Sequence, residues 1–251
     1  MQPNELEGLV KRCLDDFYGR RLRNLTTLKL RTMLRKKNPY LFRAMGLLDA
    51  HDIVTHLLQA HVSSSDEGIF GDAFFEPIAK AVSGGVVAPS EGVDVAVETD
   101  DKYKAISVKS GPNIFNASQA KRMNQEFLSL RSRLLKLHKQ FDALLGHGYG
   151  RKSLEVTASR AYRIRAGQAF WEEVTGDPDF YLKLIRLMKE YPAQHRAVYQ
   201  EERAKAVNRF TGEFLTDFAA SDGSIDWEKL VRFNSGKDKP PPRPRKGPIS
   251  E

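Results

Sequence analysis

The stretch GVDVAVETDDKYKAISVKSGPN, residues 92–113, contains two short segments in which apolar and polar residues alternate. Val93, Val95 and Val97 recur at every second position of the first segment, and Ile106 and Val108 do so in the second. A period of two predicts a β-hairpin with a polar loop over residues 99–102, in which the valines of the first segment share one face. Residues whose numbers sum to about 201–203 then lie opposite each other, so Asp94 faces Ser107 or Lys109. An acid and a lysine are therefore expected to meet on one face.

The sequence around this hairpin favours helices. Apolar residues at helical spacings predict helices over 4–60 and near 65–82, with a loop over 83–92. After the hairpin, steps of three or four residues predict a long amphipathic helix from Asn116 to about Leu145; the residues in this row are Met123, Phe127, Leu130, Leu134, Leu137 and Phe141. The remaining predicted elements are strands within 153–157 and 161–167, then helices from 168, over 178–191 and over 193–220. This order indicates an α/β (α+β) fold with a mixed sheet core and helical extensions at both ends.

Length and composition set the domain organisation. The chain has 251 residues, of which 41% are hydrophobic, enough to bury a sizeable core. We predict a basic helical region over 1–62, a core with C-terminal helices over 63–236, and a disordered, basic, proline-rich tail over 237–251. The chain shows neither an apolar run of membrane-spanning length nor a signal peptide, so a cytoplasmic protein without membrane contact is expected. Its single cysteine, Cys13, lies on an apolar helical stripe and is expected in the core.

Charge is distributed unevenly along the chain. The net charge is +8, yet residues 51–101 carry one basic and ten acidic side chains. The flanking segments are basic, with eleven basic and five acidic residues in 1–50, and fourteen and three in 102–165. Gathered carboxylates suit a hard metal cation, and basic flanks suit a nucleic acid around it. The alternative is that these charges are solvated faces of separate helices.

Asp94 together with Ser107, Val108 and Lys109 resembles the active-site hairpin of the PD-(D/E)xK nucleases, which have the restriction-endonuclease-like fold. Two positions depart from the pattern: Val93 stands where the family often has proline, and Ser107 where it usually has an acid. The resemblance implies metal ligation at Asp94 and Val108. Phosphodiester hydrolysis needs a cation held by oxygen ligands and a group that orients or deprotonates water, which are roles for Asp94 and Lys109. Alternatively, Lys109 is an edge-strand lysine that protects the sheet.

A serine at position 107 leaves the predicted metal site one carboxylate short. In some similar restriction enzymes the following helix supplies it, and Glu126 is the only acid in the first three turns of that predicted helix. Glu126 forms a row with Gln119 and Arg122, so it is either a metal ligand or a helix glutamate paired with Arg122. Glu76, at the family position of an upstream helical acid, is a second candidate for catalysis and metal binding. Gln119 is a third way to complete the site.

Longer fragments narrow the resemblance. Six of them, in this order and nearly spanning residues 30–236, are similar to the PmeII-type family of bacterial type II restriction endonucleases: KKNPYLFRAMG, SSSDEGIFGDAFFEPIAKAVSGG, EGVDVAVE, YKAISVKSGPNIFNASQAKR, GYGRK and GQAFWEEVTGDPDFYLKLIRLM. The resemblance implies a Mg²⁺-dependent, sequence-specific double-stranded DNA endonuclease with a separate methyltransferase in the same restriction–modification system. Mn²⁺ is expected to substitute for Mg²⁺, and Ca²⁺ to bind without cleavage. A two-fold symmetric DNA site favours a homodimer.

Basic and amide side chains near expected loops and helix ends are the candidates for DNA contact. They are Lys36, Lys37, Arg43, Gln119, Lys121, Arg122, Arg151, Lys152, Arg163 and Arg165. Two alternative functions stay open. One is a nuclease of low specificity in DNA repair or phage defence, and the other is a DNA-binding module without catalysis, for which Ser107 is the best argument.

Overall fold

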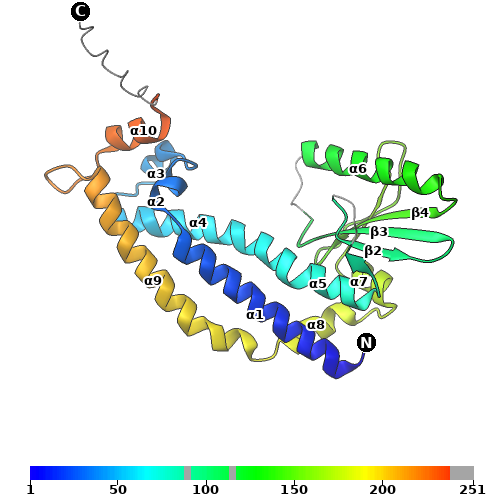
Figure 1. The fold of residues 1–251 in the computed structure, drawn as a ribbon. Helices are drawn as coiled ribbons and strands as arrows, with labels where there is room; N and C mark the ends of the chain where they lie inside the picture. The colour runs from blue at the N-terminus through cyan, green and yellow to red at the C-terminus, as the bar shows by residue number, and fades with distance from the viewer. Residues whose placement is uncertain (88–91, 113–116, 238–251) are drawn as a thin grey trace, which may run out of the picture. The chain divides into compact units, whose positions relative to one another are not determined.

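The computed structural model describes residues 1–87, 92–112 and 117–237 (Figure 1). The chain divides into two units. The first consists of residues 1–26 and 62–202, and the second of residues 27–61 and the segment from 203 onward. Residues 238–251, which make up nearly all of the predicted disordered tail, lie outside the described residues.

The first unit is built on a six-stranded mixed sheet with strand order β1-β2-β3-β4-β6-β5. Pairing is antiparallel from β1 to β3, parallel from β3 through β4 to β6, and antiparallel between β6 and β5. The strands are β1 (Val86–Val87), β2 (Val95–Glu98), β3 (Lys102–Lys109), β4 (Gln140–His147), β5 (Ser153–Leu154) and β6 (Arg163–Ala166). The mixed sheet with flanking helices confirms the predicted fold class, and both short strands predicted after residue 150 are present. The predicted loop over 83–92 contains β1.

The register of the hairpin confirms the prediction from residue alternation. Val95 is paired with Ile106 and Glu98 with Tyr103, so the numbers of paired residues sum to 201. Ahead of β2, the Asp94 N–H donates to the Ile106 carbonyl at 3.0 Å. One detail of the prediction was wrong. Val93 lies on the opposite face of the sheet from Val95, because the chain has not yet entered the regular strand at that residue.

The predicted helix from Asn116 to Leu145 was wrong in its C-terminal part. Helix α6 (Ala117–Leu135) ends early, and the apolar residues beyond it form β4 at the centre of the sheet. Leu144 and Leu145 are both buried, on opposite faces of the sheet. A strand that is covered on both faces has no polar side, so its sequence shows no alternation. The apolar residues of β4 happen to fall at the three- and four-residue steps of the preceding helix, which explains the wrong prediction. Helix α6 connects the parallel strands β3 and β4, as a crossover connection requires.

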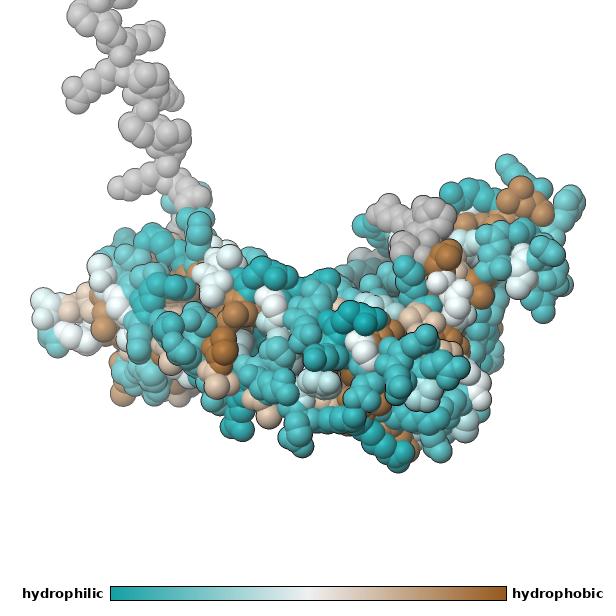
Figure 2. Space-filling view, turned by 60° about the horizontal axis from the view of Figure 1, so that its bottom comes forward, coloured by the Kyte–Doolittle hydropathy of each residue, from teal (hydrophilic) through white to brown (hydrophobic). Residues whose placement is uncertain are grey.

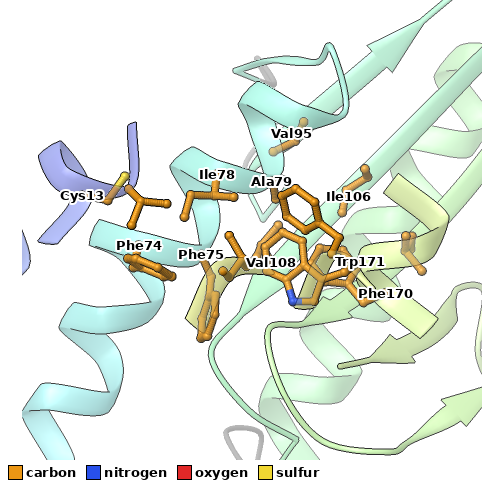
Figure 3. Close-up of a cluster of buried hydrophobic side chains, with 14 of the residues drawn as sticks. Cys13, Phe74, Phe75, Ile78, Ala79, Val95, Ile106, Val108, Phe170 and Trp171 are labelled. Atoms are coloured by element: carbon orange, nitrogen blue, oxygen red, sulfur yellow. The ribbon is translucent and has the colours of Figure 1, made fainter. Parts of the chain in front are cut away.

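Two hydrophobic clusters cover the two faces of the sheet. Helix α6 packs on one face through residues such as Phe127 and Leu130. On the other face, α1 (Pro3–Thr27), α5 (Glu76–Val82), α7 (Gln168–Thr175) and α8 (Phe180–Met188) supply the cluster drawn in Figure 3. Cys13 belongs to this cluster and is buried as predicted; burial raises the pKa of its thiol to about 11. Trp171 is anchored there by its indole N–H, which donates to the Gly148 carbonyl at 2.9 Å.

The helix predicted near residues 65–82 continues a longer helical stretch. Helix α4 (Ala50–Phe70) passes into a π turn over Gly71–Phe75 and then into α5. The predicted helix start near residue 65 was wrong, because Ser63, Ser64 and Ser65 lie inside α4. A π turn inserts an extra residue into a helix and so shifts which side chains face the sheet after it.

The second unit is helical. It contains α2 (Leu30–Leu34), α3 (Pro39–Ala44) and α10 (Trp227–Ser235), with parts of α4 and of α9 (Tyr191–Phe218). The Asn234 side chain donates to the carbonyls of Leu34 and Lys37, both at 2.8 Å, which attaches α10 to the end of α2. The Arg43 guanidinium lies 5.4 Å from the Trp227 ring centroid, within cation–π range. Of the residues described, none forms a helix long and apolar enough to cross a membrane. Figure 2 shows a face that is mostly hydrophilic, with hydrophobic residues in separate patches.

Candidate active site

The carboxylate of Asp94 is the centre of a hydrogen-bonded group at the open end of the hairpin. Its Oδ2 accepts from the Val108 N–H at 2.7 Å, from the Lys109 ammonium at 3.2 Å and from the Ser107 hydroxyl at 3.3 Å. The predicted meeting of Asp94 with Ser107 and Lys109 is therefore confirmed. Three donors on one oxygen fix the orientation of this carboxylate.

Glu76 joins the group through Lys109. The Lys109 Nζ lies 3.6 Å from Glu76 Oε1, so a single ammonium bridges two carboxylates. Burial raises the pKa of Glu76 to about 7, and the negative charge of Asp94 acts in the same direction, against the attraction of Lys109. Two acids close enough to repel each other form a site whose charge a cation would balance.

The main chain of Val108 faces the same edge as Asp94. The Ile106 carbonyl accepts from Asp94, whereas the Lys109 carbonyl accepts from Gly148 on the β4 side. Main-chain groups alternate between the two edges of a strand, so the Val108 carbonyl lies on the same edge of β3 as its N–H, which donates to Asp94. Carboxylate and carbonyl oxygens are the ligands that Mg²⁺ prefers.

Three polar residues near this site were not among the predicted site residues: His147, Asp72 and Arg20. His147 at the end of β4 is paired in register with Lys109 and is 2% exposed; burial lowers the pKa of its imidazole to about 4, so the ring is neutral near pH 7. The negative charges of Asp72 and Glu76 act on Arg20 of α1, whose guanidinium bonds Asp16 at 2.7 Å. No local pattern in the sequence marks these residues, because they come from separate elements.

Glu126 lies near the hairpin but outside the group around Asp94. Its Oε1 accepts from the Arg122 guanidinium at 2.8 Å, which is the pairing that the alternative interpretation expected. Its other oxygen lies against Gly92, where an added Cβ would be only 2.0 Å away. Gln119 is exposed near the start of α6. Among the described residues, no cluster of three acidic, histidine or cysteine side chains is arranged to hold a metal ion.

The candidate DNA-binding residues fall into three settings. Lys36, Lys37 and Arg43 belong to the second unit. Gln119, Lys121 and Arg122 lie exposed in the first turns of α6, and Arg151 and Lys152 lie exposed in the segment after β4. The remaining two, Arg163 and Arg165, are held in a network of partly buried ion pairs.

These ion pairs centre on Glu173 of α7. Its carboxylate lies 2.7 Å from the Arg163 guanidinium, 2.7 Å from the Lys104 ammonium and 3.4 Å from the Arg165 guanidinium. Arg163 also bonds Asp142 of β4 at 2.7 Å. The network thus joins β3, β4, β6 and α7 through partly buried charges.

The comparison with known families decides the class of the protein. The family model of the type II restriction endonuclease EcoO109I matches residues 4–196, most of the chain. The chain belongs to the EcoO109I family of type II restriction endonucleases. Membership in this family means a nuclease that acts on DNA, and type II restriction endonucleases generally use a divalent metal ion. The PmeII-type resemblance stays a prediction. A search of curated proteins found no match.

Proposed function

We propose that the protein is a Mg²⁺-dependent, sequence-specific endonuclease that cuts double-stranded DNA and leaves 5′-phosphate and 3′-hydroxyl ends. The observation that carries this proposal is the arrangement of Asp94, Lys109 and Glu76 at the open end of a β-hairpin in a chain of the EcoO109I family. An ammonium that lies between two carboxylates, one of which has a raised pKa, is typical of a catalytic site.

The oxygens of Asp94 and Val108, with those of one further acid, would hold the divalent ion. When bound, the ion neutralises charge on the phosphate and lowers the pKa of coordinated water. Lys109 is placed to hold the attacking water and to offset the negative charge that develops on the phosphate. Asp94 keeps the Lys109 ammonium in place through their 3.2 Å contact.

The geometry favours Glu76 over Glu126 and Gln119 as the source of the further ligand. Glu76 shares Lys109 with Asp94, whereas the nearest ion-pair partner of Glu126 is Arg122. We therefore expect Glu76→Gln to abolish cleavage and Glu126→Gln to retain it, because only the first change removes a charge from the site. The opposite result would assign the ligand to Glu126, and each variant serves as the control for the other.

For DNA binding we propose the candidate side chains outside the network around Glu173. In the first unit these are the exposed Gln119, Lys121, Arg122, Arg151 and Lys152, and in the second Lys36, Lys37 and Arg43. Phosphate contacts of this kind fix the register of a protein on DNA. We further propose a cytoplasmic homodimer that acts beside a methyltransferase which protects the host DNA.

Digestion of unmethylated plasmid DNA tests the proposal. With Mg²⁺ or Mn²⁺ we expect discrete fragments, and with Ca²⁺ we expect DNA binding without cleavage. A smear of fragments would indicate a nuclease without sequence specificity. Intact DNA under every metal condition would contradict the proposed catalysis.

A further inference from the structure

The chain that follows Lys109 is held by contacts to two other elements of the first unit. Ser110 is 3% exposed, and its hydroxyl donates to Glu67 of α4 at 2.6 Å. Its carbonyl accepts from the Tyr149 N–H at 3.2 Å, and the Lys109 carbonyl accepts from the Gly148 N–H at 2.9 Å. The backbone next to Lys109 is therefore fixed through both side-chain and main-chain bonds.

Glu67 makes a second contact that closes this group. Glu67 and Tyr149 line one hollow, and the nearby Glu67 carboxylate raises the pKa of the Tyr149 phenol. The Tyr149 ring covers Gly111, where an added Cβ would lie 2.3 Å from the phenol end of the ring, so a larger residue there would displace Tyr149. On another side, a Cβ added to Gly71 in the π turn would lie 3.3 Å from the Ser110 Cβ. Close packing therefore adds to the hydrogen bonds that hold Ser110.

We propose that Glu67, Ser110 and Tyr149 form a clamp that positions Lys109 for catalysis, an inference that rests on the proposed nuclease function. Lys109 is the last residue of β3, so the chain directly after it is held by contacts outside the regular sheet. Its ammonium nevertheless has to reach both Asp94 and Glu76. The three clamp residues act through Lys109 and are positioning residues.

The helical stretch that carries Glu67 explains why this clamp suits catalysis. Glu67 lies near the end of α4, and Glu76 lies directly after the π turn of the same continuous stretch. One carboxylate of this stretch holds the residue after Lys109, and the other pairs with the Lys109 ammonium. The backbone next to Lys109 and the Lys109 ammonium are thus both held by the same helical stretch. This arrangement keeps the distance between Lys109 and the acids constant.

The test uses the full chain with Glu67→Gln, Ser110→Ala and Tyr149→Phe. We expect each variant to lower the single-turnover cleavage rate in Mg²⁺ by about tenfold or more, since small displacements of catalytic groups have such effects. Affinity for duplex DNA in Ca²⁺ should stay within about twofold of the unaltered protein. In a Lys109→Ala background the same changes should lower the residual rate no further, because their effect passes through Lys109. Tyr181→Phe, at a partly exposed tyrosine of α8, is the matched control.

Three results would overturn the clamp: full cleavage rates in all three variants, losses explained by weaker DNA binding, or losses that add to Lys109→Ala. Glu67 is exposed, so Glu67→Gln keeps the fold and tests the clamp even where Ser110→Ala unfolds the chain. The proposed function has its own point of failure. If the unaltered protein cuts no DNA in Mg²⁺, the nuclease proposal fails, whereas full-rate cleavage by variants of an active enzyme rejects only the clamp.

Discussion

At the scale of single residues, the site depends on one ammonium shared by two acids. Lys109 lies 3.2 Å from Asp94 and 3.6 Å from Glu76, and no other cation among the described residues forms an ion pair with either acid. Removing any one of the three therefore changes the charge seen by the other two. This coupling makes conservative substitutions informative.

Asp94→Asn and Lys109→Ala should each lower DNA cleavage by at least about 10²-fold, because the first removes a metal-binding charge and the second the group that assists the water. Binding of duplex DNA without cleavage, measured in Ca²⁺ for Lys109→Ala, should persist. Near-normal cleavage by either variant would reject the assignment of the site.

The raised pKa of Glu76 predicts a pH dependence of stability. Its pKa is about 4.5 in the unfolded chain and about 7 in the folded one. Protonated Glu76 therefore contributes its full share to the free energy of unfolding below pH 4.5, and this share is lost as pH rises through about 7. Glu76→Gln cannot ionise and escapes this loss. Without metal, the variant should gain about 2 kcal/mol on the unaltered protein between pH 4 and pH 8, after allowance for the partly exposed side chain. Parallel curves of unfolding free energy against pH would contradict the raised pKa.

At the scale of elements, Glu173 holds α7 against two strands, β3 and β6, by charge. Removing its charge leaves Lys104, Arg163 and Arg165 without their shared partner, so Glu173→Gln should lower the free energy of unfolding by about 2 kcal/mol. The neighbouring Glu172 is exposed, and Glu172→Gln should change stability by less than about 0.5 kcal/mol. Urea titrations of both variants at pH 7 make the comparison. Equal midpoints would show that the network adds nothing to stability.

The elements also show what the sequence could predict. The hairpin and its register followed from alternation, because one arm places Asp94 among valines and the other places Lys109 after Ile106 and Val108. Strand β4 was missed, since burial on both faces removes the alternation that marks a strand. The contact of Glu76 with Lys109 depends on the π turn, and a single inserted residue leaves no periodic signal. In the sequence Glu76 was therefore one of two candidate acids, and only the structure shows its contact with Lys109.

At the scale of the whole molecule, the net charge of +8 predicts DNA affinity that depends on salt. Lysine and arginine contacts release counterions from the DNA, so the affinity in Ca²⁺ should fall steeply between about 50 mM and 200 mM salt. Fluorescence anisotropy of a labelled duplex gives the slope of log affinity against log salt. A slope near zero would argue against DNA binding by the basic residues.

The two tryptophans of the chain allow each unit to be followed separately. Trp171 is 1% exposed and bonds Gly148 in the first unit, whereas Trp227 in the second unit is only partly buried beside Arg43. The fluorescence of the buried Trp171 should be blue-shifted and should resist quenching by acrylamide. The fluorescence of Trp227 should lie at longer wavelength and should be quenched more readily. Following the two signals separately during denaturation would therefore reveal whether the first unit unfolds together with the second or independently of it.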